Sequence, residues 1–370
     1  MALSRCPVWL ICGGQSPEHE ISFSSGRTAA ANVDHARYAL FPVYIRRDGL
    51  WALADEPLGP RADKEEVEAR FAALSAEGGH VPAAPIELLT AGQAASKARR
   101  QGVEAVLLIL HGALGEDGTI QGMLEMEGLS YAGSGVLASA LAMDKSRCQC
   151  YLKACGLPTP PCVAEEGPFD AEGLARFAQR AEREAGIPCV VKPSRAGSSV
   201  GIAIVRDRAQ LPEAIQAASA IDPLVMVERY EKGEETTCAV LEVVKEGRRI
   251  RRAMPVTAIR PKHSEFFDYQ AKYTPGECDE ITPAPISAAA SKRIQELAVQ
   301  AFEALGCRDM ARVDFILSSQ GPVILEINTI PGLTPTSLLP QGAAHGGISF
   351  PALLDLLIEN ARARRPTKPN

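Results

Sequence analysis

Unbroken apolar runs alternate with amphipathic stretches over the first part of the chain. Apolar runs at 8–12, 40–45 and 105–110 predict buried strands, and a helical pattern begins at about Ser24. Strands and helices that alternate in this way form a small doubly wound α/β sheet. The stretch 56–85 is rich in Ala, Glu, Gly and Pro, so we expect it to leave the sheet and to lie outside its core.

The pattern changes after a helix predicted at 137–154, and we expect a second domain to start near Ser134. Four strands rich in β-branched residues are predicted next, at 188–192, 201–205, 224–228 and 236–244. A polar loop then precedes a helix and two strands, predicted respectively at 260–282, 287–305, 311–317 and 323–328.

Composition narrows the class of protein. The 370 residues are 46% hydrophobic and 23% charged, which is typical of a globular chain and excludes disorder. The net charge of −6 gives no reason to expect a nucleic acid or a membrane as partner. The apolar runs are shorter than the roughly 20 residues that cross a bilayer, and the cysteines form no C-x-x-C pair. We therefore expect a cytoplasmic protein with reduced thiols.

The last two predicted strands form a hairpin with a polar face. If Leu317 pairs with Val323, four polar residues share one face: Arg312, Asp314, Glu326 and Asn328. The other face is apolar: Val313, Phe315, Leu325 and Ile327. Two carboxylates and an amide at this spacing suit Mg²⁺, which prefers oxygen ligands. The alternative is a solvated polar face with one ion pair, because antiparallel sheets often have such faces.

A second candidate site is the glycine-containing loop at 190–202, between two apolar strands. Lys192 and the loop N–H groups suit phosphate binding, although a surface β-turn remains the alternative. The G-x-S-x-G pattern at 197–201 is followed by a strand where a hydrolase elbow needs a helix. The G-x-G-x-x-A pattern at 133–138 lacks the acidic residue of a dinucleotide fold, and no phosphate-loop motif occurs.

These parts point to phosphoryl transfer by positioning and charge neutralisation, since the chain offers no activated nucleophile. A carboxylate acceptor needs no general base, because it is already ionised at pH 7. It does need cations that offset its repulsion from a triphosphate. The candidate cations are Lys145, Lys192, Lys272 and Arg312.

Six segments in order carry a resemblance to ATP-grasp ligases and, more narrowly, to the D-alanine–D-alanine ligase family. They are GGQSPEHEIS (13–22), HGALGEDGTIQG (111–122), MDK (143–145), the Lys192 loop, FDYQAKY (267–273) and 312–338. The resemblance implies an α/β ATP-grasp fold, with a small doubly wound N-terminal sheet and two ATP-grasp subdomains. The implied domains are 1–133 for substrate binding, 134–228 as the central subdomain and 229–370 with the metal site and a lid loop.

The resemblance also implies roles for single residues. Two Mg²⁺ ions, which Mn²⁺ can replace, would be held by Asp314, Glu326 and Asn328. ATP would be bound through its phosphates by Lys145, Lys192 and Lys272, and through adenine and ribose by Glu228, Tyr230 and Glu235. The first substrate's ammonium would be bound by Glu18, with His111 nearby. The oxyanion would be stabilised by Arg312 and Gly332, and the second substrate's carboxylate would be bound by Ser337 and Leu338. Loop closure would use a hydrogen-bonded set of Glu18, Ser198 and Tyr273.

The function that the resemblance implies is the ATP-dependent joining of two D-alanines through a D-alanyl phosphate, for peptidoglycan precursors, by a cytoplasmic homodimer. The polar loop at 260–282 would then cover the reactive acyl phosphate and exclude water. One alternative is an ATP-grasp ligase for another acceptor, such as D-lactate, D-serine or another amino acid. Another is a nucleotide-binding regulatory module without turnover, which the retained polar residues disfavour. Tyr273 favours an amine acceptor by family analogy.

Overall fold

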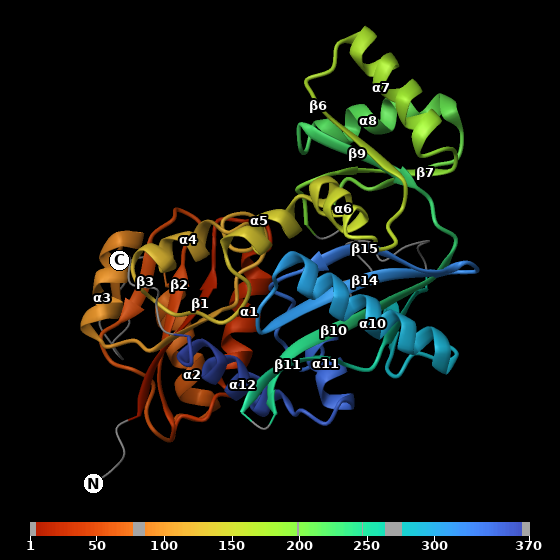
Figure 1. Cartoon of the computed structure of the whole chain (residues 1–370). Helices are drawn as coiled ribbons and strands as arrows, with labels where there is room; N and C mark the ends of the chain where they lie inside the picture. Colours follow the sequence, from red (N-terminus) through yellow and green to blue (C-terminus); the bar gives the residue numbers. More distant parts are fainter. Residues whose placement is uncertain (1–4, 77–85, 198–199, 246, 263–275, 365–370) are drawn as a thin grey trace, which may run out of the picture.

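The computed structural model describes residues 5–76, 86–197, 200–245, 247–262 and 276–364, whose strands form three sheets. Figure 1 shows the first sheet in red and orange, the second in green and the third in green and blue. None of the described helices is both long enough and apolar enough to cross a membrane.

The first sheet has five strands, in the spatial order β4 (Ile86–Leu89), β3 (Trp51–Ala54), β2 (Tyr38–Ile45), β1 (Cys6–Gly13) and β5 (Ala105–Leu108). The pairs of β1 with β2 and β5 are parallel, whereas β3 and β4 pair antiparallel. The three predicted strands are confirmed as β1, β2 and β5. The two short strands β3 and β4 were not predicted.

Two predictions about the first sheet were wrong. Helix α1 (His19–Ala30) begins five residues before the predicted start. The stretch 56–85 contains helix α2 (Lys64–Ser75), and residues 77–85 lie outside the described part. Val67 and Phe71, four residues apart on one face of α2, are 1% exposed and belong to the first sheet's core. The Ala- and Glu-rich composition of this stretch is that of a helix packed on the core, not that of a segment outside it.

The second sheet is antiparallel, in the order β6 (Cys162–Glu166), β9 (Leu224–Arg229), β7 (Cys189–Pro193) and β8 (Ala203–Val205). Helices α7 (Ala171–Glu184) and α8 (Leu211–Ser219) pack on it around a separate core that includes Phe177 and Ile215. Strand β8 begins two residues after its predicted start, because Gly201 turns the chain with a φ of 75°.

The third sheet has six strands: β13 (Cys278–Ile281), β12 (Thr257–Pro261), β10 (Gly233–Lys245), β14 (Met310–Ser318) and β15 (Gly321–Asn328) in order, with β11 (Arg248–Ala253) also on β10. The predicted loop at 260–282 is therefore wrong in part, since β12 and β13 pair across it. Residues 263–275 lie outside the described chain. Helix α10 (Ala288–Leu305) packs on this sheet, and Ser287 caps it by accepting from the Ala290 N–H at 3.2 Å.

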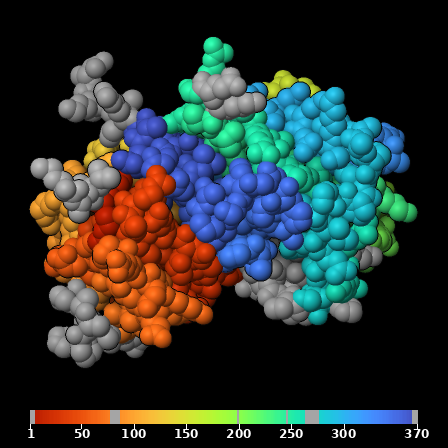
Figure 2. Space-filling model, turned by 90° about the horizontal axis from the view of Figure 1, so that it is seen from below, coloured from red at the N-terminus to blue at the C-terminus, as the bar shows by residue number. Residues whose placement is uncertain are grey.

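The end of the chain returns to the first sheet. Helices α11 (Leu338–His345) and α12 (Phe350–Arg362) join one apolar core with β1, β5 and residues of the third sheet. In this core Leu353 and Leu357 are fully buried together with Leu241 and Met310. Figure 2 shows these dark blue helices between the red N-terminal part and the cyan part of the chain. The first and third sheets are thus held together by a shared apolar core.

Candidate active site

A cavity of about 1440 Å³ is lined by α1, by the second sheet and by the third sheet. Fourteen residues proposed from the sequence line it: Glu18, His111, Lys145, Lys192, Glu228, Tyr230, Glu235, Arg312, Asp314, Glu326, Asn328, Gly332, Ser337 and Leu338. The other three, Ser198, Lys272 and Tyr273, lie outside the described residues. Residues up to 320 positions apart in the sequence therefore meet in one site.

The β14–β15 hairpin supplies the polar face on one side of this cavity. Arg312 pairs with Asn328 and Asp314 with Glu326, as the sequence predicts. Arg312 donates from Nε and Nη2 to the two carboxylate oxygens of Asp314, at 2.9 and 2.8 Å. Asp314 also accepts from Thr237 Oγ1 at 2.6 Å and from Asn328 Nδ2 at 3.2 Å. This carboxylate is therefore fixed from three directions.

The predicted register is wrong nearer to the turn. Leu317 pairs with Pro322 and not with Val323, because the turn closes on Ser318 and Gly321. A β-bulge restores the pairing at Asp314. The register shift moves Ile324 opposite Phe315, where Leu325 was expected. As a result Ile324 is fully buried, whereas Leu325 lines the cavity.

The hairpin's oxygen atoms fit a hard cation by their chemistry. Asp314 and Glu326 offer carboxylates, and Asn328 uses Nδ2 toward Asp314, so its Oδ1 is the atom that can bind a cation. Within the described part of the chain, no group of three or more His, Cys, Asp or Glu could hold a metal ion. The candidate ligand set is thus two carboxylates and one amide, which suits Mg²⁺ better than a transition metal.

Lys192 and Glu228 form a buried ion pair on adjacent strands of the second sheet. The Lys192 Nζ lies 2.6 Å from Glu228 Oε1. Gln149 donates to the other Glu228 oxygen at 2.7 Å and to the Leu325 carbonyl at 3.0 Å. The sequence analysis missed Gln149. Its signal was its place four residues after Lys145, on the same face of a helix.

Lys145 starts a helix rather than lying within one. The single predicted helix at 137–154 is two helices, α5 (Val136–Met143) and α6 (Lys145–Ala154). Asp144 separates them, because its carboxylate accepts from the N–H of Arg147 at 3.1 Å and caps α6. Lys145 donates to the Ala196 carbonyl at 2.8 Å and lies 3.3 Å from Glu326. It therefore links the glycine loop to the hairpin.

Three titratable groups line the cavity beside the first sheet: Glu18, His111 and Glu116. Glu18 immediately precedes α1, and a Cβ on either Gly112 or Gly197 would come within 3.0 Å of its Oε2. His111 is buried, and its Nε2 has no hydrogen-bond partner among the described residues. Burial lowers the pKa of His111, which favours the neutral imidazole.

Glu116 is the one of these three groups to which the sequence analysis gave no role. It accepts from the Gly112 N–H at 2.6 Å. Burial, followed by the negative charge of Glu18, raises the pKa of Glu116 to about 8. The signal for it was its place in the GEDG segment that follows His111.

Gly332 and Ser337 approach each other closely before α11. A Cβ on Gly332 would lie 2.9 Å from Ser337 Oγ, so this position has no room for a side chain. Ser337 Oγ accepts from the Thr334 N–H at 3.2 Å, and Leu338 begins α11. Gly332, Ser337 and Leu338 all line the cavity.

The remaining described candidates, Tyr230 and Glu235, also line the cavity. Tyr230 follows β9, and the guanidinium of Arg206 lies 5.8 Å from the centre of its ring. Glu235 lies on β10, with Ile259 and Ile316 as its strand partners. Both residues therefore lie where apolar and acidic groups can surround a planar ring and its hydroxyl-bearing sugar.

Two family models match the chain. The model described as D-ala D-ala ligase N-terminus matches residues 7–134, and that described as D-ala D-ala ligase C-terminus matches residues 151–359. The D-alanine--D-alanine ligase of Streptomyces coelicolor is 39% identical over 372 residues, which cover 97% of this chain and 94% of that protein. That of Mycolicibacterium smegmatis is 37% identical over 368 residues, with 97% and 96% covered.

Solved structures agree with the sequence matches. The D-alanine-D-alanine ligase of Coxiella burnetii has a TM-score of 0.77 and 28% identity, with 98% of this chain and 95% of that chain covered. The VanG D-Ala:D-Ser ligase of Enterococcus faecalis has a TM-score of 0.77 and 32% identity, with 97% and 100% covered. The Bacillus anthracis D-alanine--D-alanine ligase complexed with ATP has a TM-score of 0.70 and 27% identity, with 97% and 98% covered.

These matches confirm the α/β ATP-grasp architecture that was expected from the sequence, and they cover nearly the whole chain. They also confirm the resemblance that the six ordered segments carried. The chain belongs to the D-alanine–D-alanine ligase family.

Proposed function

We propose that this chain joins two D-alanines into D-alanyl-D-alanine with consumption of ATP, as a step in peptidoglycan precursor synthesis. Its family membership supports the reaction, and the structure complexed with ATP supports the nucleotide. The observation that carries the proposal is the convergence of three cation–carboxylate pairs on one cavity: Lys145–Glu326, Lys192–Glu228 and Arg312–Asp314.

The charge pattern of these pairs suits a metal-bound triphosphate. Phosphate oxygens can take the place of the carboxylates beside Lys145 and Lys192, and Lys272 would contact the γ phosphate. Asp314, Glu326 and Asn328 would hold two Mg²⁺ ions, which Mn²⁺ can replace. Bound Mg²⁺ would neutralise phosphate charge. Glu228, Tyr230 and Glu235 would bind adenine and ribose.

The first D-alanine would bind with its ammonium at Glu18, beside His111. The carboxylate of this first D-alanine attacks the γ phosphorus of ATP, so ADP leaves and a D-alanyl phosphate forms. The amine of a second D-alanine, held through its carboxylate by Ser337 and Leu338, then attacks the acyl carbon and phosphate leaves. Arg312 and the Gly332 N–H would stabilise the oxyanion of the tetrahedral intermediate. Ser198 and Tyr273 would close the loop with Glu18.

The proposal predicts that the purified chain releases one ADP and one phosphate per D-alanyl-D-alanine when Mg-ATP and D-alanine are supplied. The measurement is coupled ADP release with mass detection of the product, with L-alanine as the control that should give no dipeptide. One structural relative is named a D-Ala:D-Ser ligase, so D-alanine with D-serine, and likewise with D-lactate, tests the alternative acceptors. ADP release only with such an acceptor would change the substrate, and no release at all would favour a regulatory module.

We also propose an organisation into domains 1–133, 134–228 and 229–370, and assembly into a cytoplasmic homodimer. Support for the homodimer comes from α4 (Thr119–Met126) and α5, which pack against each other. Met126 on α4 is 90% exposed and Leu137 on α5 is 77% exposed. Large apolar side chains that are exposed on neighbouring helices suit burial against a second copy. No nucleic acid or membrane partner is part of the proposal.

A further inference from the structure

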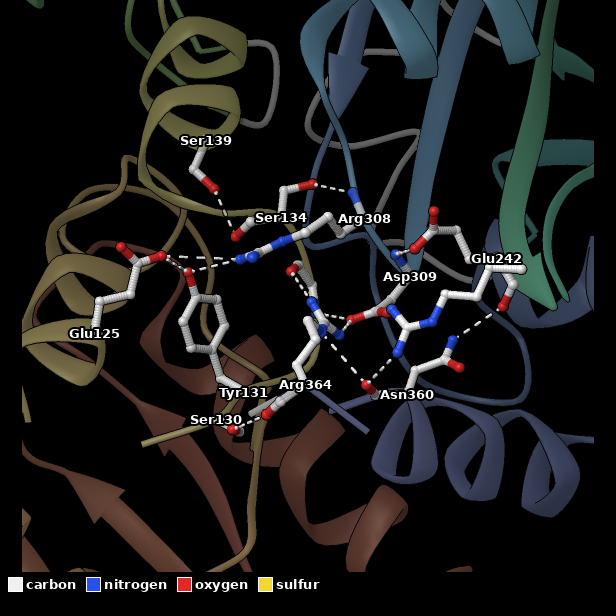
Figure 3. A network of polar contacts seen from close by, with 12 residues as sticks. Glu125, Ser130, Tyr131, Ser134, Ser139, Glu242, Arg308, Asp309, Asn360 and Arg364 are labelled. Atoms are coloured by element: carbon white, nitrogen blue, oxygen red, sulfur yellow. Dashed lines mark hydrogen bonds and ion pairs between the residues drawn. The ribbon is translucent and has the colours of Figure 1, made fainter. Parts of the chain in front are cut away.

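Asp309 lies at the centre of a buried polar network outside the cavity, immediately before β14 (Figure 3). Its side chain is fully buried. Its Oδ2 accepts from the Gly133 N–H at 2.6 Å and from the guanidinium of Arg364. Its backbone N–H donates to Glu242 Oε2 at 3.1 Å, and its carbonyl accepts from the Glu242 N–H at 2.8 Å. One residue thus joins the start of β14 to three separate segments.

The segment that contains Gly133 is itself attached to the first sheet. The Val106 N–H donates to the Ser130 carbonyl, and the Ala132 N–H donates to the Val106 carbonyl, both at 2.8 Å. Arg364 adds a bond from Nη1 to the Gly133 carbonyl at 3.3 Å, and its own carbonyl accepts from Ser130 Oγ at 2.6 Å. Residues 130–133 are therefore fastened to β5 on one side and to Asp309 on the other.

Asp309 has two features that cost stability. Its φ of 59° lies in the left-handed region, where glycine carries no steric penalty. Its buried Oδ1 has no hydrogen-bond partner among the residues that the structure describes. Glycine would satisfy the backbone without either cost, so the backbone alone does not explain an aspartate here. The carboxylate itself has a role.

The network joins strands β5 and β14, and each of these strands positions a residue of the proposed site. Strand β5 leads directly to His111, and β14 carries Arg312 three residues after Asp309. The nucleotide residues lie on the second and third sheets, and helix α6 links the hairpin to this site without Asp309, through the Lys145–Glu326 pair and the bond from Gln149 to the Leu325 carbonyl. A loss of the Asp309 contacts would therefore loosen the first substrate's binding groups relative to Arg312, and would leave the nucleotide strands in place.

We propose that Asp309 is a positioning residue, whose carboxylate fixes β14 against the first sheet so that Arg312 stays in place relative to His111 and Glu18. This inference rests on the proposed function, which assigns Glu18 and His111 to the first D-alanine. Displacements of about 1 Å at reacting groups are enough to change rates by large factors. The carboxylate's effect should therefore appear in the use of D-alanine, measured as kcat/KM, rather than in ATP binding.

The decisive variant is Asp309→Gly, which accepts the left-handed backbone and removes only the carboxylate. We expect kcat/KM for the first D-alanine to fall about tenfold or more, with the KM for ATP changed less than about twofold. Asp309→Asn keeps an acceptor for the Gly133 N–H, so its kinetic constants should lie between those of Asp309→Gly and those of the original chain. Tyr131→Phe is the control, because it removes the hydrogen bonds of the Tyr131 hydroxyl with Glu125 and Arg308 but none to Asp309. Its kcat/KM for D-alanine and its KM for ATP should match those of the original chain.

An unchanged kcat/KM for D-alanine in Asp309→Gly would overturn the proposal, as would a lower Tm with kcat and both KM values unchanged, since that pattern indicates a purely structural role. Hydrogen exchange gives a readout that needs no substrate. Peptides covering 105–112 and 310–316 should exchange faster in Asp309→Gly than in Tyr131→Phe. Equal exchange in the two variants would also overturn it. Failure of dipeptide synthesis by the unmodified chain would speak against the proposed function. The exchange experiment would still test whether Asp309 fixes β14 against the first sheet, because it needs no substrate.

Discussion

At the scale of single residues, Glu116 couples the edge of the cavity to pH. Burial and the charge of Glu18 raise its pKa to about 8, against an ordinary value of 4.5. Between these two values the folded chain holds a proton at this position that the unfolded chain has lost. Stability from this group is therefore fully present below pH 4.5, falls as the pH rises, and is lost above about pH 8.

A residue-scale prediction follows from this loss of stability with rising pH. Glu116→Gln mimics the protonated side chain and should flatten the fall in unfolding free energy between pH 5 and pH 8, by about 3.5 kcal/mol over the interval. Urea unfolding at several pH values measures it. Glu172→Gln on α7, where the glutamate is exposed, is the control and should leave the original slope. The same slope in Glu116→Gln would show that Glu116 is not the titrating group.

Which residues could be predicted at this scale depended on how local their partners are. Asp314 and Glu326 face each other across a short hairpin, so alternation along two strands was enough to pair them. Gln149 was missed, because its partners Glu228 and Leu325 are 79 and 176 residues away. The one local signal, its place four residues after Lys145, is shared by solvated helix residues and did not reveal these partners.

At the scale of elements, periodicity predicted α10 and the strands of the hairpin, but it failed where one side chain interrupts a period. The residues of α5 and α6 continue one helical pattern across Asp144. Burial alone would raise the pKa of Asp144, but bonds from the Arg147 N–H and from Ser146 lower it below its usual range. The ionised carboxylate therefore competes with the helix backbone and sets the break.

The break at Asp144 leads to an element-scale prediction. Asp144→Ala should remove the cap of α6, lower the unfolding free energy by about 1 kcal/mol, and raise the KM for ATP severalfold because Lys145 is no longer fixed. Thermal unfolding and ATP-dependent kinetics measure the two effects. Asp170→Ala removes an equivalent cap from α7, away from the cavity, so it should lower stability without changing the KM for ATP. An equal KM change in both variants would contradict the assignment of Lys145 to ATP.

At the scale of the whole molecule, the order of motifs predicted which residues belong to one site, but it did not predict how the sheets are fixed to each other. The return of α11 and α12 to the first sheet depends on apolar contacts between the two ends of the chain. The Asp309 contacts join segments 55 and 176 residues apart. Contacts at such separations cannot be predicted from periodicity, because periodicity reports only on residues that are close to each other in the sequence.

The assembly of the molecule gives the last prediction. If α4 and α5 form the interface between two copies, then Leu137→Asp places a charge in an apolar contact, where it has no partner, and should convert the dimer into a monomer. Sedimentation velocity over a range of protein concentrations measures the state. Val244→Asp is the matched control, because Val244 is 59% exposed on β10, away from these helices, and its replacement should leave the dimer intact. A monomeric unmodified chain, or a Leu137→Asp variant that stays dimeric, would place the interface elsewhere or remove it. Because one chain supplies the fourteen described site residues, the monomeric variant should retain ATP-dependent ligation, and that separates assembly from chemistry.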